Sequence, residues 1–347
     1  MKRIAVDLAK SVYQVAESVR AGEVAQRKRL NREAFGRYVQ EQAEAVEWVM
    51  EACGTAHYWG RVMQVRGHKV LLLHPRYVRP YRRRNKTDRN DCDAILEAAR
   101  CRGIHPVPVK SLEQQQLQQL HNLRETWKRS RVQRINLLRG IFREMGIEVP
   151  ASTAAFLRAA CELLERPEVS ALRGALQVML GEINLYEQSM QECEAQLARW
   201  HAEDEVVRKL DEVSGIGLLT ASALKTAVGN PERFANGRQL SAWLGMTPRE
   251  HSSGERRHLG HISRQGNVYV RTLLIHGSRA ALLAAQRCQA RTPERMTALQ
   301  RWATHTAARI GPNKAAVALA NKLVRICWAV WCHQRRFSGN WQSMPPA

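Results

Sequence analysis

Residues 3–8, Arg3-Ile4-Ala5-Val6-Asp7-Leu8, form a short apolar run that carries a carboxylate near its end. An apolar run of this length near the N-terminus predicts a buried strand. Burying an unpaired carboxylate is costly, so Asp7 needs a partner at the end of that strand. Val46–Glu51 repeats the arrangement, with Glu51 closing a second apolar run before the turn residue Gly54. The two acids are therefore expected to face one shared site.

The first 108 residues read as mixed α/β. Strands are expected at 3–8, 12–19, 23–30, 45–51 and 69–73, with helices near 31–43 and 55–66. Three strands, a helix, a strand, a helix and a strand is the order of an α/β RNase H-like (RuvC-like) fold. In such a fold an acid of the first strand, an acid of the fourth strand and acids of a later helix converge on one face.

Two more acids lie in the most basic part of the chain, Asn85–Asp91. Asp88 and Asp91 are three residues apart and share one face of a helical turn. The segment from Arg76 to Arg89 contains seven Lys or Arg and no acid besides Asp88. Two close carboxylates repel unless a cation lies between them, and Mg²⁺ or Mn²⁺ suits oxygen ligands. A salt-bridged surface helix is the alternative interpretation of this stretch alone.

Length and charge restrict the class of protein. The 347 residues can bury more than one core, and the formal charge of +22 with a pI near 10.3 favours a polyanionic partner, nucleic acid above all. A membrane partner is not expected, because Lys322 and Arg325 interrupt the apolar run Ala315–Trp331 and no apolar signal region follows Met1. The eight scattered Cys lack CxxC spacing and predict reduced thiols in a cytoplasmic protein.

The middle segment, 109–204, is expected to be helical. Residues 111–145 form a strongly basic pattern, whose stripe of Arg and Lys suits RNA or DNA phosphates or a solvated helix face. The acidic pattern at 169–201 has apolar residues at alternating spacings of four and three, from Leu172 to Trp200. Such a heptad seam predicts a coiled coil, formed with the basic helix or with another subunit.

The remaining chain is expected to be all helix and turn over 205–333, followed by a disordered tail at 334–347. Val213–Gly217 has the form of a helix-hairpin-helix module, in which glycines let backbone N–H groups approach a phosphate. Gly245–Gly254 is polar and rich in turn residues, and several Arg follow it. A serine on such a turn can present its hydroxyl, but Ser-Gly in a loop is usually only a turn.

Taken together, these segments resemble a known family. The set Val6–Lys10, Met50–Thr55 and Asn85–Asp91 resembles the RuvC-like "DEDD" transposases of bacterial insertion sequences, and more narrowly the insertion-sequence one-ten family of bridge-RNA-guided recombinases. The resemblance continues, in order, through Ser214–Gly217, Leu244–Pro248, Ser253-Gly254 and the helix at 315–331. It covers nearly the whole chain, and its combination of motifs is specific where each motif alone is not.

The resemblance implies a fold, a reaction and a set of residues. It implies a RuvC-like domain at 1–108, a helical coiled-coil middle and a mainly α C-terminal transposase domain. Mg²⁺ (or Mn²⁺) would be bound by four acids, and a serine would attack DNA and form a phosphoserine link. Carried over by position, the catalytic residues are Asp7, Glu51, Asp88, Asp91 and Ser253, with Ser252 second in rank to Ser253 and Asp93 as a supporting acid.

The family also implies partners: donor and target DNA, a structured guide (bridge) RNA, and a homo-oligomer, a dimer or tetramer in which acids of one subunit meet the serine of another. Our candidates for nucleic-acid contacts are basic residues of the two basic segments and of the segment after Ser253. They are Arg82, Arg83, Arg84, Lys86, Arg124, Lys128, Arg131, Arg134, Arg256 and Arg257.

Two other functions compete with this interpretation. A RuvC-type hydrolytic junction resolvase or nuclease would explain the acids and the charge through metal-activated water, but it would leave Ser253-Gly254 without a purpose. A non-catalytic nucleic-acid-binding protein with a degenerate nuclease domain would make no use of the acids. Replacing Ser253 or Asp91 by alanine distinguishes these readings.

Overall fold

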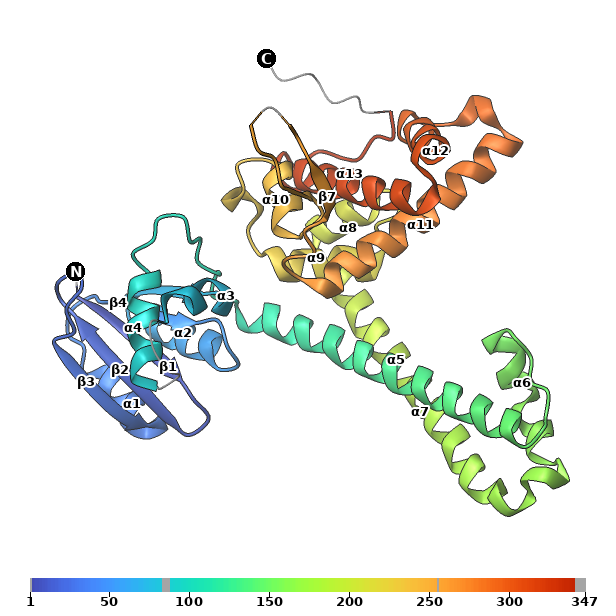
Figure 1. Cartoon of the computed structure of the whole chain (residues 1–347), viewed down its shortest axis with the longest axis horizontal. Helices are drawn as coiled ribbons and strands as arrows, with labels where there is room; N and C mark the ends of the chain where they lie inside the picture. Colours follow the sequence, from blue (N-terminus) through green and yellow to red (C-terminus); the bar gives the residue numbers. More distant parts are fainter. Residues whose placement is uncertain (1, 83–87, 255, 341–347) are drawn as a thin grey trace. The chain divides into compact units, whose positions relative to one another are not determined.

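The structure is a computed structural model that describes residues 2–82, 88–254 and 256–340 (Figure 1). The backbone of Asp88 and Arg89 is described but their side chains are not. The chain divides into two compact units, residues 1–115 and 116–347, and each is described by itself. The expected division at 108, 204 and 333 is finer than these two units and stays a prediction.

The first unit contains one mixed sheet with helices on both faces (Figure 1). Its elements are β1 (Arg3–Leu8), β2 (Val12–Ser18), β3 (Gln26–Asn31), α1 (Arg32–Gln40), β4 (Glu47–Glu51), α2 (Ala56–Val65), β5 (Lys69–Leu73), α3 (Pro75–Val78), η1 (Arg79–Tyr81) and α4 (Asp88–Ala98). The sheet order is β3-β2-β1-β4-β5. β1 pairs antiparallel with β2 and parallel with β4, and β5 continues the parallel half. The element order expected from the sequence is confirmed, and it is consistent with an RNase H-like fold.

Alternation along β1 and β4 separates two cores. Ile4 and Trp48 point to the face covered by α1 and α2, where they pack with aromatic residues such as Phe35. Ala5 and Val49 point to the opposite face and pack against α4. Since side chains alternate in a strand, Asp7 and Glu51 belong to the α4 face.

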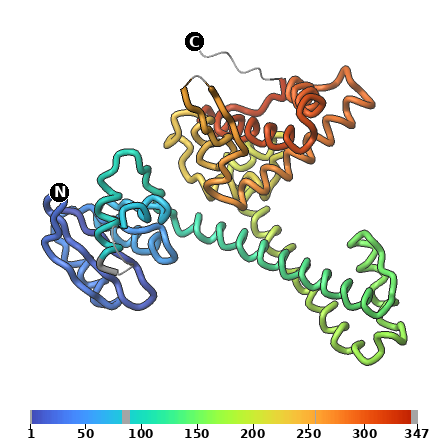
Figure 2. Tube along the Cα trace, viewed as in Figure 1, coloured from blue at the N-terminus to red at the C-terminus, as the bar shows by residue number. Residues whose placement is uncertain are grey.

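The second unit begins with a pair of long helices that run side by side (Figure 2). These are α5 (Leu112–Glu144), which starts at the end of the first unit, and α7 (Arg173–Glu203). Three ion pairs show that the two helices are antiparallel, because successive arginines along α5 pair with glutamates of decreasing residue number in α7. The pairs are Arg124–Glu194, Arg131–Glu187 and Arg134–Glu182, at 2.6, 2.6 and 2.8 Å.

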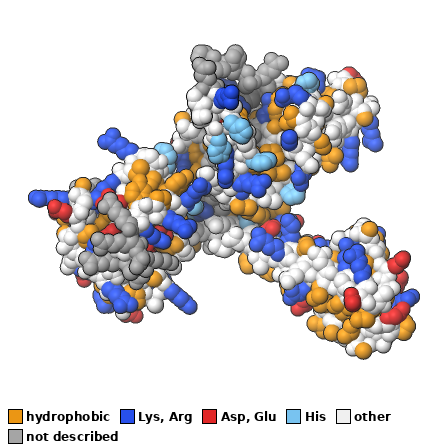
Figure 3. Space-filling model, in the orientation of Figure 1, with side chains coloured by type: hydrophobic (Ala, Val, Ile, Leu, Met, Phe, Trp, Pro, Cys, Tyr) orange, Lys and Arg blue, Asp and Glu red, His pale blue; other side chains and the backbone are white. Residues whose placement is uncertain are grey.

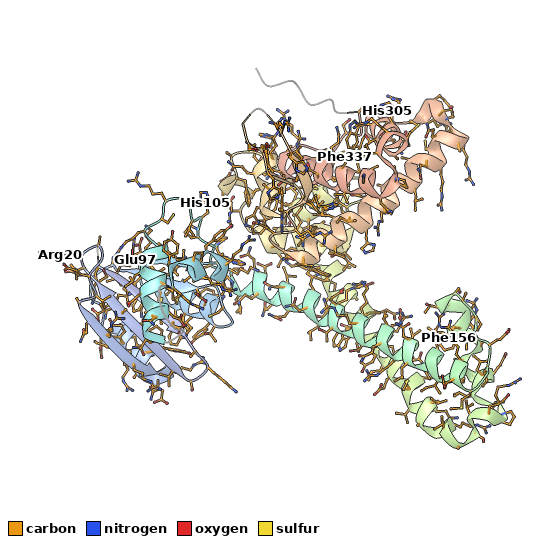
Figure 4. All side chains as sticks on the ribbon, in the orientation of Figure 1. Arg20, Glu97, His105, Phe156, His305 and Phe337 are labelled. Atoms are coloured by element: carbon orange, nitrogen blue, oxygen red, sulfur yellow. The ribbon has the colours of Figure 1, made fainter. Side chains whose placement is uncertain are left out.

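The far end of this helix pair has its own small core. Here α6 (Thr153–Leu164) and η2 (Pro167–Leu172) connect α5 to α7. Phe156 of α6 packs edge-on against Phe142 of α5, with ring centroids 6.1 Å apart (Figure 4). Leu176 and Ile183 of the heptad pattern are buried in the same cluster. The predicted apolar seam of α7 therefore faces α5 of the same chain over this stretch.

The rest of the second unit is mainly helical around one large core. Its elements are α8 (Glu205–Asp211), α9 (Leu218–Val228), η3 (Pro231–Arg233), α10 (Gly237–Trp243), β6 (Pro248–Glu250), β7 (Leu259–Ile262), α11 (Val268–Arg291), η4 (Pro293–Arg295), α12 (Ala298–Ile310) and α13 (Pro312–Cys332). Within the described chain, α13 is the one helix long and apolar enough to cross a membrane. It contributes Leu319, Leu323 and Cys327 to the buried core, as the central helix of a folded domain does.

Two features depart from the expectation of helix and turn followed by a disordered tail. β6 and β7 form an antiparallel hairpin, which the sequence concealed because the strands are short and exposed, with no alternation of apolar residues. In the tail, the Gly339 carbonyl accepts a hydrogen bond from Leu299 N–H, and Phe337 packs against the core (Figure 4). Residues 341–347 lie outside the described residues.

Candidate functional site

Asp7 and Glu51 lie beside each other at the carboxyl ends of two neighbouring strands. β1 and β4 are parallel, and Val6 pairs with Met50 immediately before the two acids. The nearby Cys53 thiol is close to both acids. Burial raises the pKa of Cys53, and the charges of both Asp7 and Glu51 raise it further. The expected convergence of the first-strand and fourth-strand acids is therefore supported by register and by electrostatics.

Helix α4 carries the third described carboxylate to the same face. The helix begins at Asp88, and Asp91, three residues on, is 6% exposed. Cys92 fixes this end of the helix on the sheet, because its thiol donates to the Gln14 carbonyl at 3.2 Å. Asp7 lies close enough to contribute, after burial, to the raised pKa of Cys92, which is about 12. The Asp88 side chain lies outside the described residues, so its predicted role stays a prediction.

Arg82 links two of these carboxylates. Its Nε is 2.6 Å from Asp91 Oδ1, and its Nη2 donates to Glu51 Oε1 at 3.4 Å. One guanidinium therefore spans the strand end of β4 and the first turn of α4. Arg82 was predicted to contact nucleic acid; here it neutralises the acidic site, and its contact with nucleic acid stays a prediction.

The residue types fit a divalent cation. Carboxylate oxygens are the ligands that Mg²⁺ and Mn²⁺ prefer, and the Arg82 guanidinium stands in for a cation between Glu51 and Asp91. Among the residues that the structure describes, no three acidic, His or Cys side chains are close enough to form a metal site. The three described ligands, Asp7, Glu51 and Asp91, thus lie on one face, but they are not drawn together around a point.

Asp93, the fifth acid of this region, has a separate partner. Its carboxylate pairs with Arg27 of β3 at 2.7 Å. Arg27 extends from the edge strand of the sheet, so the pair fastens α4 across β2 and β3. The predicted role of Asp93 as a supporting acid of the site stays a prediction.

The β6–β7 hairpin separates the two candidate serines onto opposite faces. Beyond the paired strands, Ser253 and Arg256 exchange backbone hydrogen bonds at 3.3 and 3.2 Å across the turn at the tip. Alternation then places Ser252 on one face with Glu250 and Ser253 on the other. Gly254, which follows Ser253, has φ +56° and nothing within 4 Å of an added Cβ. The described residues therefore leave space at Gly254.

The Ser252 hydroxyl is engaged in local hydrogen bonds, whereas the Ser253 hydroxyl has no partner among the described residues. The Ser252 hydroxyl donates to Glu250 Oε1 at 2.8 Å and accepts from His258 N–H at 3.1 Å. The Ser252 hydrogen bond and the charge of Arg257 lower the pKa of Glu250, so this carboxylate stays ionised and keeps its hold on Ser252. Ser253 is exposed, and its hydroxyl makes no hydrogen bond with any other described residue.

The base of the hairpin is held by side-chain hydrogen bonds from two helices, which were not predicted from the sequence. Arg271 of α11 is buried, and its guanidinium donates to the carbonyls of Leu244 and Gln265, at 3.0 and 2.8 Å. Asn321 of α13 donates to the Met246 carbonyl at 3.0 Å. Both side chains fasten the strand ends to the helical core. The only sequence signal was the Arg-rich stretch after Ser253, which does not distinguish Arg271 from its neighbours.

Gly245 occupies one of the tightest points of this base. Its φ is +72°, and an added Cβ would lie 2.2 Å from the Gln265 carbonyl oxygen. Only glycine fits a backbone approach this close at positive φ. The Leu244–Pro248 motif, noted for its resemblance to the transposase family, thus forms the base of the β6–β7 hairpin that carries Ser252 and Ser253 (the serine hairpin).

The predicted nucleic-acid contacts fall into three groups. Arg83, Arg84 and Lys86 lie outside the described residues. The basic residues of α5 are largely engaged by acids: Arg124, Arg131 and Arg134 pair with α7, and Lys128 lies 3.6 Å from Glu125. Arg256 and Arg257 are exposed on the hairpin. Figure 3 shows Lys, Arg and His side chains over the C-terminal helical elements on this face.

The turn predicted as part of a helix-hairpin-helix module makes a close contact between two backbones, and its role in binding phosphate stays a prediction. Gly215 and Gly277 of α11 approach so closely that a Cβ on Gly277 would lie 1.9 Å from the Gly215 carbonyl oxygen. Helix α9 starts directly after Gly217, and no side chain of the described residues caps it.

Comparison with known proteins assigns both units to one kind of protein. The DEDD transposase family matches residues 4–147, and the family described as "Transposase IS116/IS110/IS902 family" matches residues 207–295. The first match contains the described acids and α4, and the second contains the serine hairpin.

Full-length relatives give the same assignment. A "Probable family 20 transposase" of Pseudomonas aeruginosa is 38% identical over 95% of this chain and 96% of its own length. The "Transposase for insertion sequence element IS1111A" of Coxiella burnetii is 34% identical over 97% and 91%. The corresponding protein of IS1328 from Yersinia enterocolitica is 30% identical over 96% and 98%. This chain therefore belongs to the IS110 family of insertion-sequence transposases, enzymes that act on DNA.

Proposed function

We propose that this transposase cuts and rejoins DNA through a covalent bond between Ser253 and a DNA phosphate, with sequence choice delegated to a guide RNA. The observation that carries the proposal is the separation of the two serines at the hairpin tip. Ser252 is held by Glu250, whereas Ser253 is exposed beside an open glycine. The Ser253 hydroxyl can approach a phosphate without breaking a hydrogen bond to a described residue, whereas Ser252 would have to leave Glu250.

The chemistry conserves the phosphodiester bond. The Ser253 oxygen attacks phosphorus, its proton passes to water, and the bond from phosphorus to one deoxyribose oxygen breaks as that oxygen takes up a proton. The hydroxyl of another strand then reverses the step and releases Ser253. No external energy source is needed, since one phosphoester replaces another. Arg256, paired with Ser253 across the turn, is placed to hold the attacked phosphate.

The acids provide the second half of the proposal. Asp7, Glu51, Asp88 and Asp91 would hold the divalent cation, Mg²⁺ or Mn²⁺. A cation bound there would neutralise the scissile phosphate and favour the serine alkoxide. The register of β1 and β4 and the burial of Asp91 support this grouping, because they bring carboxylates of distant segments to one face.

Partners and assembly follow from charge and from the family. We propose that donor and target DNA bind together with a structured guide (bridge) RNA in the cytoplasm, where the protein associates with the nucleoid. Base pairing to the RNA would select the sites, while the protein contacts backbones. A homo-oligomer, a dimer or tetramer, would let the acids of one subunit meet the serine of another. The +22 charge supports two nucleic-acid partners.

A hydrolytic RuvC-type nuclease is the second candidate, supported by the same carboxylates. It would use an activated water and would leave Ser253 idle. The test is to incubate the transposase and its co-expressed RNA with Mg²⁺ and labelled DNA, denature the mixture, and look for a protein–DNA adduct. The proposal requires an adduct that disappears in Ser253→Ala and persists in Ser252→Ala. Free cleaved ends without an adduct, unchanged in Ser253→Ala, would establish the hydrolytic nuclease.

A further inference from the structure

Arg82 makes contacts that the proposed metal site cannot share. A divalent cation needs carboxylate oxygens at about 2.0–2.6 Å. Two oxygens expected to serve it, Glu51 Oε1 and Asp91 Oδ1, are instead in contact with the Arg82 guanidinium at 3.4 and 2.6 Å. The pair is well shielded, since the side chains of Asp91 and Glu51 are 8% and 18% exposed. A guanidinium and a metal ion cannot lie between these oxygens together.

The backbone of Arg82 is fixed, while its side chain is placed to move. Its N–H donates to the Arg79 carbonyl at 3.2 Å, closing the short helix η1. The side chain is 26% exposed, so its long stem can turn toward solvent without moving the helix. The contact with Asp91 has the distance of an ion pair but not the alignment of a hydrogen bond. Such a partner neutralises the acids yet can be displaced.

We propose that Arg82 and a divalent cation are alternative occupants of the Glu51–Asp91 carboxylate pair. When the cation binds, the guanidinium is released at the rim of the site, where a DNA or RNA phosphate is its natural bidentate partner. Metal binding and phosphate binding then favour each other through this one side chain. This inference rests on the proposed function, since it assigns a role to Arg82 within that metal site.

The consequence for affinity has a definite sign. An arginine that only supported the acids would improve metal binding, so its loss would lower the affinity for the metal ion. An arginine that competes with the metal must be displaced, so its loss strengthens metal binding. Removing a charged contact of this kind should change the Kd for the divalent cation about tenfold.

The experiment measures Mn²⁺ binding to the full chain without nucleic acid, by titration calorimetry and by the Mn²⁺ paramagnetic resonance signal. Arg82→Gln is compared with wild type and with Arg79→Gln. The control removes an exposed charge three residues away that makes no ion pair with a described residue. We expect Arg82→Gln to bind Mn²⁺ about tenfold more tightly than wild type. Arg79→Gln should stay close to wild type, and Asp91→Asn should bind weakly.

Equal or weaker Mn²⁺ binding by Arg82→Gln than by Arg79→Gln overturns the proposal and leaves the metal site standing. An absence of Mn²⁺ binding in every variant overturns it together with the metal part of the proposed function. If Arg82→Gln does not fold, Arg82→Lys serves the same purpose, because lysine keeps the charge but loses the fork that reaches both carboxylates. Arg82→Lys must then bind Mn²⁺ more tightly than wild type, and equal binding overturns the proposal.

Discussion

The carboxylate site and the serine hairpin position their reactive groups in opposite ways. Asp7, Glu51 and Asp91 project from a buried sheet and a helix packed on it, and an arginine neutralises two of them. Ser253 is exposed on a two-stranded hairpin whose base is fastened to the helical core by Arg271 and Asn321. Charges need burial and partners to be held in place, whereas a neutral hydroxyl needs only a rigid support and open space. The predictions below test that difference, in order of decreasing effect.

The largest effect is expected from removing a buried acid. Asp91→Asn keeps the size of the side chain but removes a charge from the proposed metal site, so DNA cleavage should fall about a thousandfold or more. Asp93→Asn is the matched control two residues away, since Asp93 pairs with Arg27 outside that site. It should lower cleavage less than about tenfold. Cleavage of labelled DNA is the measurement, and equal losses in the two variants would refute the distinction.

The next effect tests where the hairpin is rigid. Gly245→Ala places a Cβ against the Gln265 carbonyl at positive φ, and it should lower the free energy of unfolding by about 3 kcal/mol. Gly254→Ala, also at positive φ but in open space, should cost only about 1 kcal/mol. Denaturant unfolding of the full chain measures both. Similar losses at the two glycines would mean that the base is no tighter than the tip.

A third effect concerns a buried polar chain within the second unit. His121 of α5 lies 3.1 Å from both Ser222 of α9 and Tyr269 of α11. Ser222 donates its hydroxyl proton to the Leu218 carbonyl, so His121 Nε2 must carry the proton it shares with Ser222, and Nδ1 accepts from Tyr269. Burial, and then the charge of Arg124, lowers the pKa of His121 from 6.5 to about 4. The neutral imidazole is therefore the form that joins the three helices.

The sign of the pH dependence follows from that shift. Between pH 6.5 and about 4 the unfolded chain binds a proton at His121 that the folded chain does not, so stability falls as the pH is lowered through this range. The loss attributable to His121 should be on the order of 2 kcal/mol. Thermal unfolding against pH, compared between wild type and His121→Gln, measures it. An unchanged slope in the variant would show that this histidine does not titrate in that range.

The smallest effect tests whether the basic helix serves the fold or nucleic acid. Arg131 pairs with Glu187, whose side chain is 42% exposed, so Glu187→Gln should cost less than about 1 kcal/mol of stability. It should also free Arg131 for phosphates and steepen the salt dependence of DNA binding. The measurement is DNA affinity over a range of salt concentrations. An unchanged slope would mean that the α5 arginines contact only α7.

The sequence predicted the order of the first unit because each strand there carries its own apolar pattern. The run 3–8 and the run ending at Glu51 became β1 and β4 with their acids side by side. The serine hairpin was missed because its strands are exposed on both faces, and because nothing in the sequence marks Arg271 and Asn321 as the side chains that hold its base. Arg82, which contacts Glu51 and Asp91, was also not singled out as their partner. Arg82 is one of several adjacent cations in the sequence, and only the fold selects it.

The two adjacent serines have a consequence for how this hairpin can change over time. Successive residues of an extended strand face opposite ways, so deletion of one residue between β6 and the tip would turn the Ser252 hydroxyl outward. Under the proposed mechanism, such a deletion would present the Ser252 hydroxyl in place of that of Ser253. Because two adjacent residues carry a hydroxyl, a serine would stay exposed at the tip after the loss of one residue from this strand, but not after replacement of both serines.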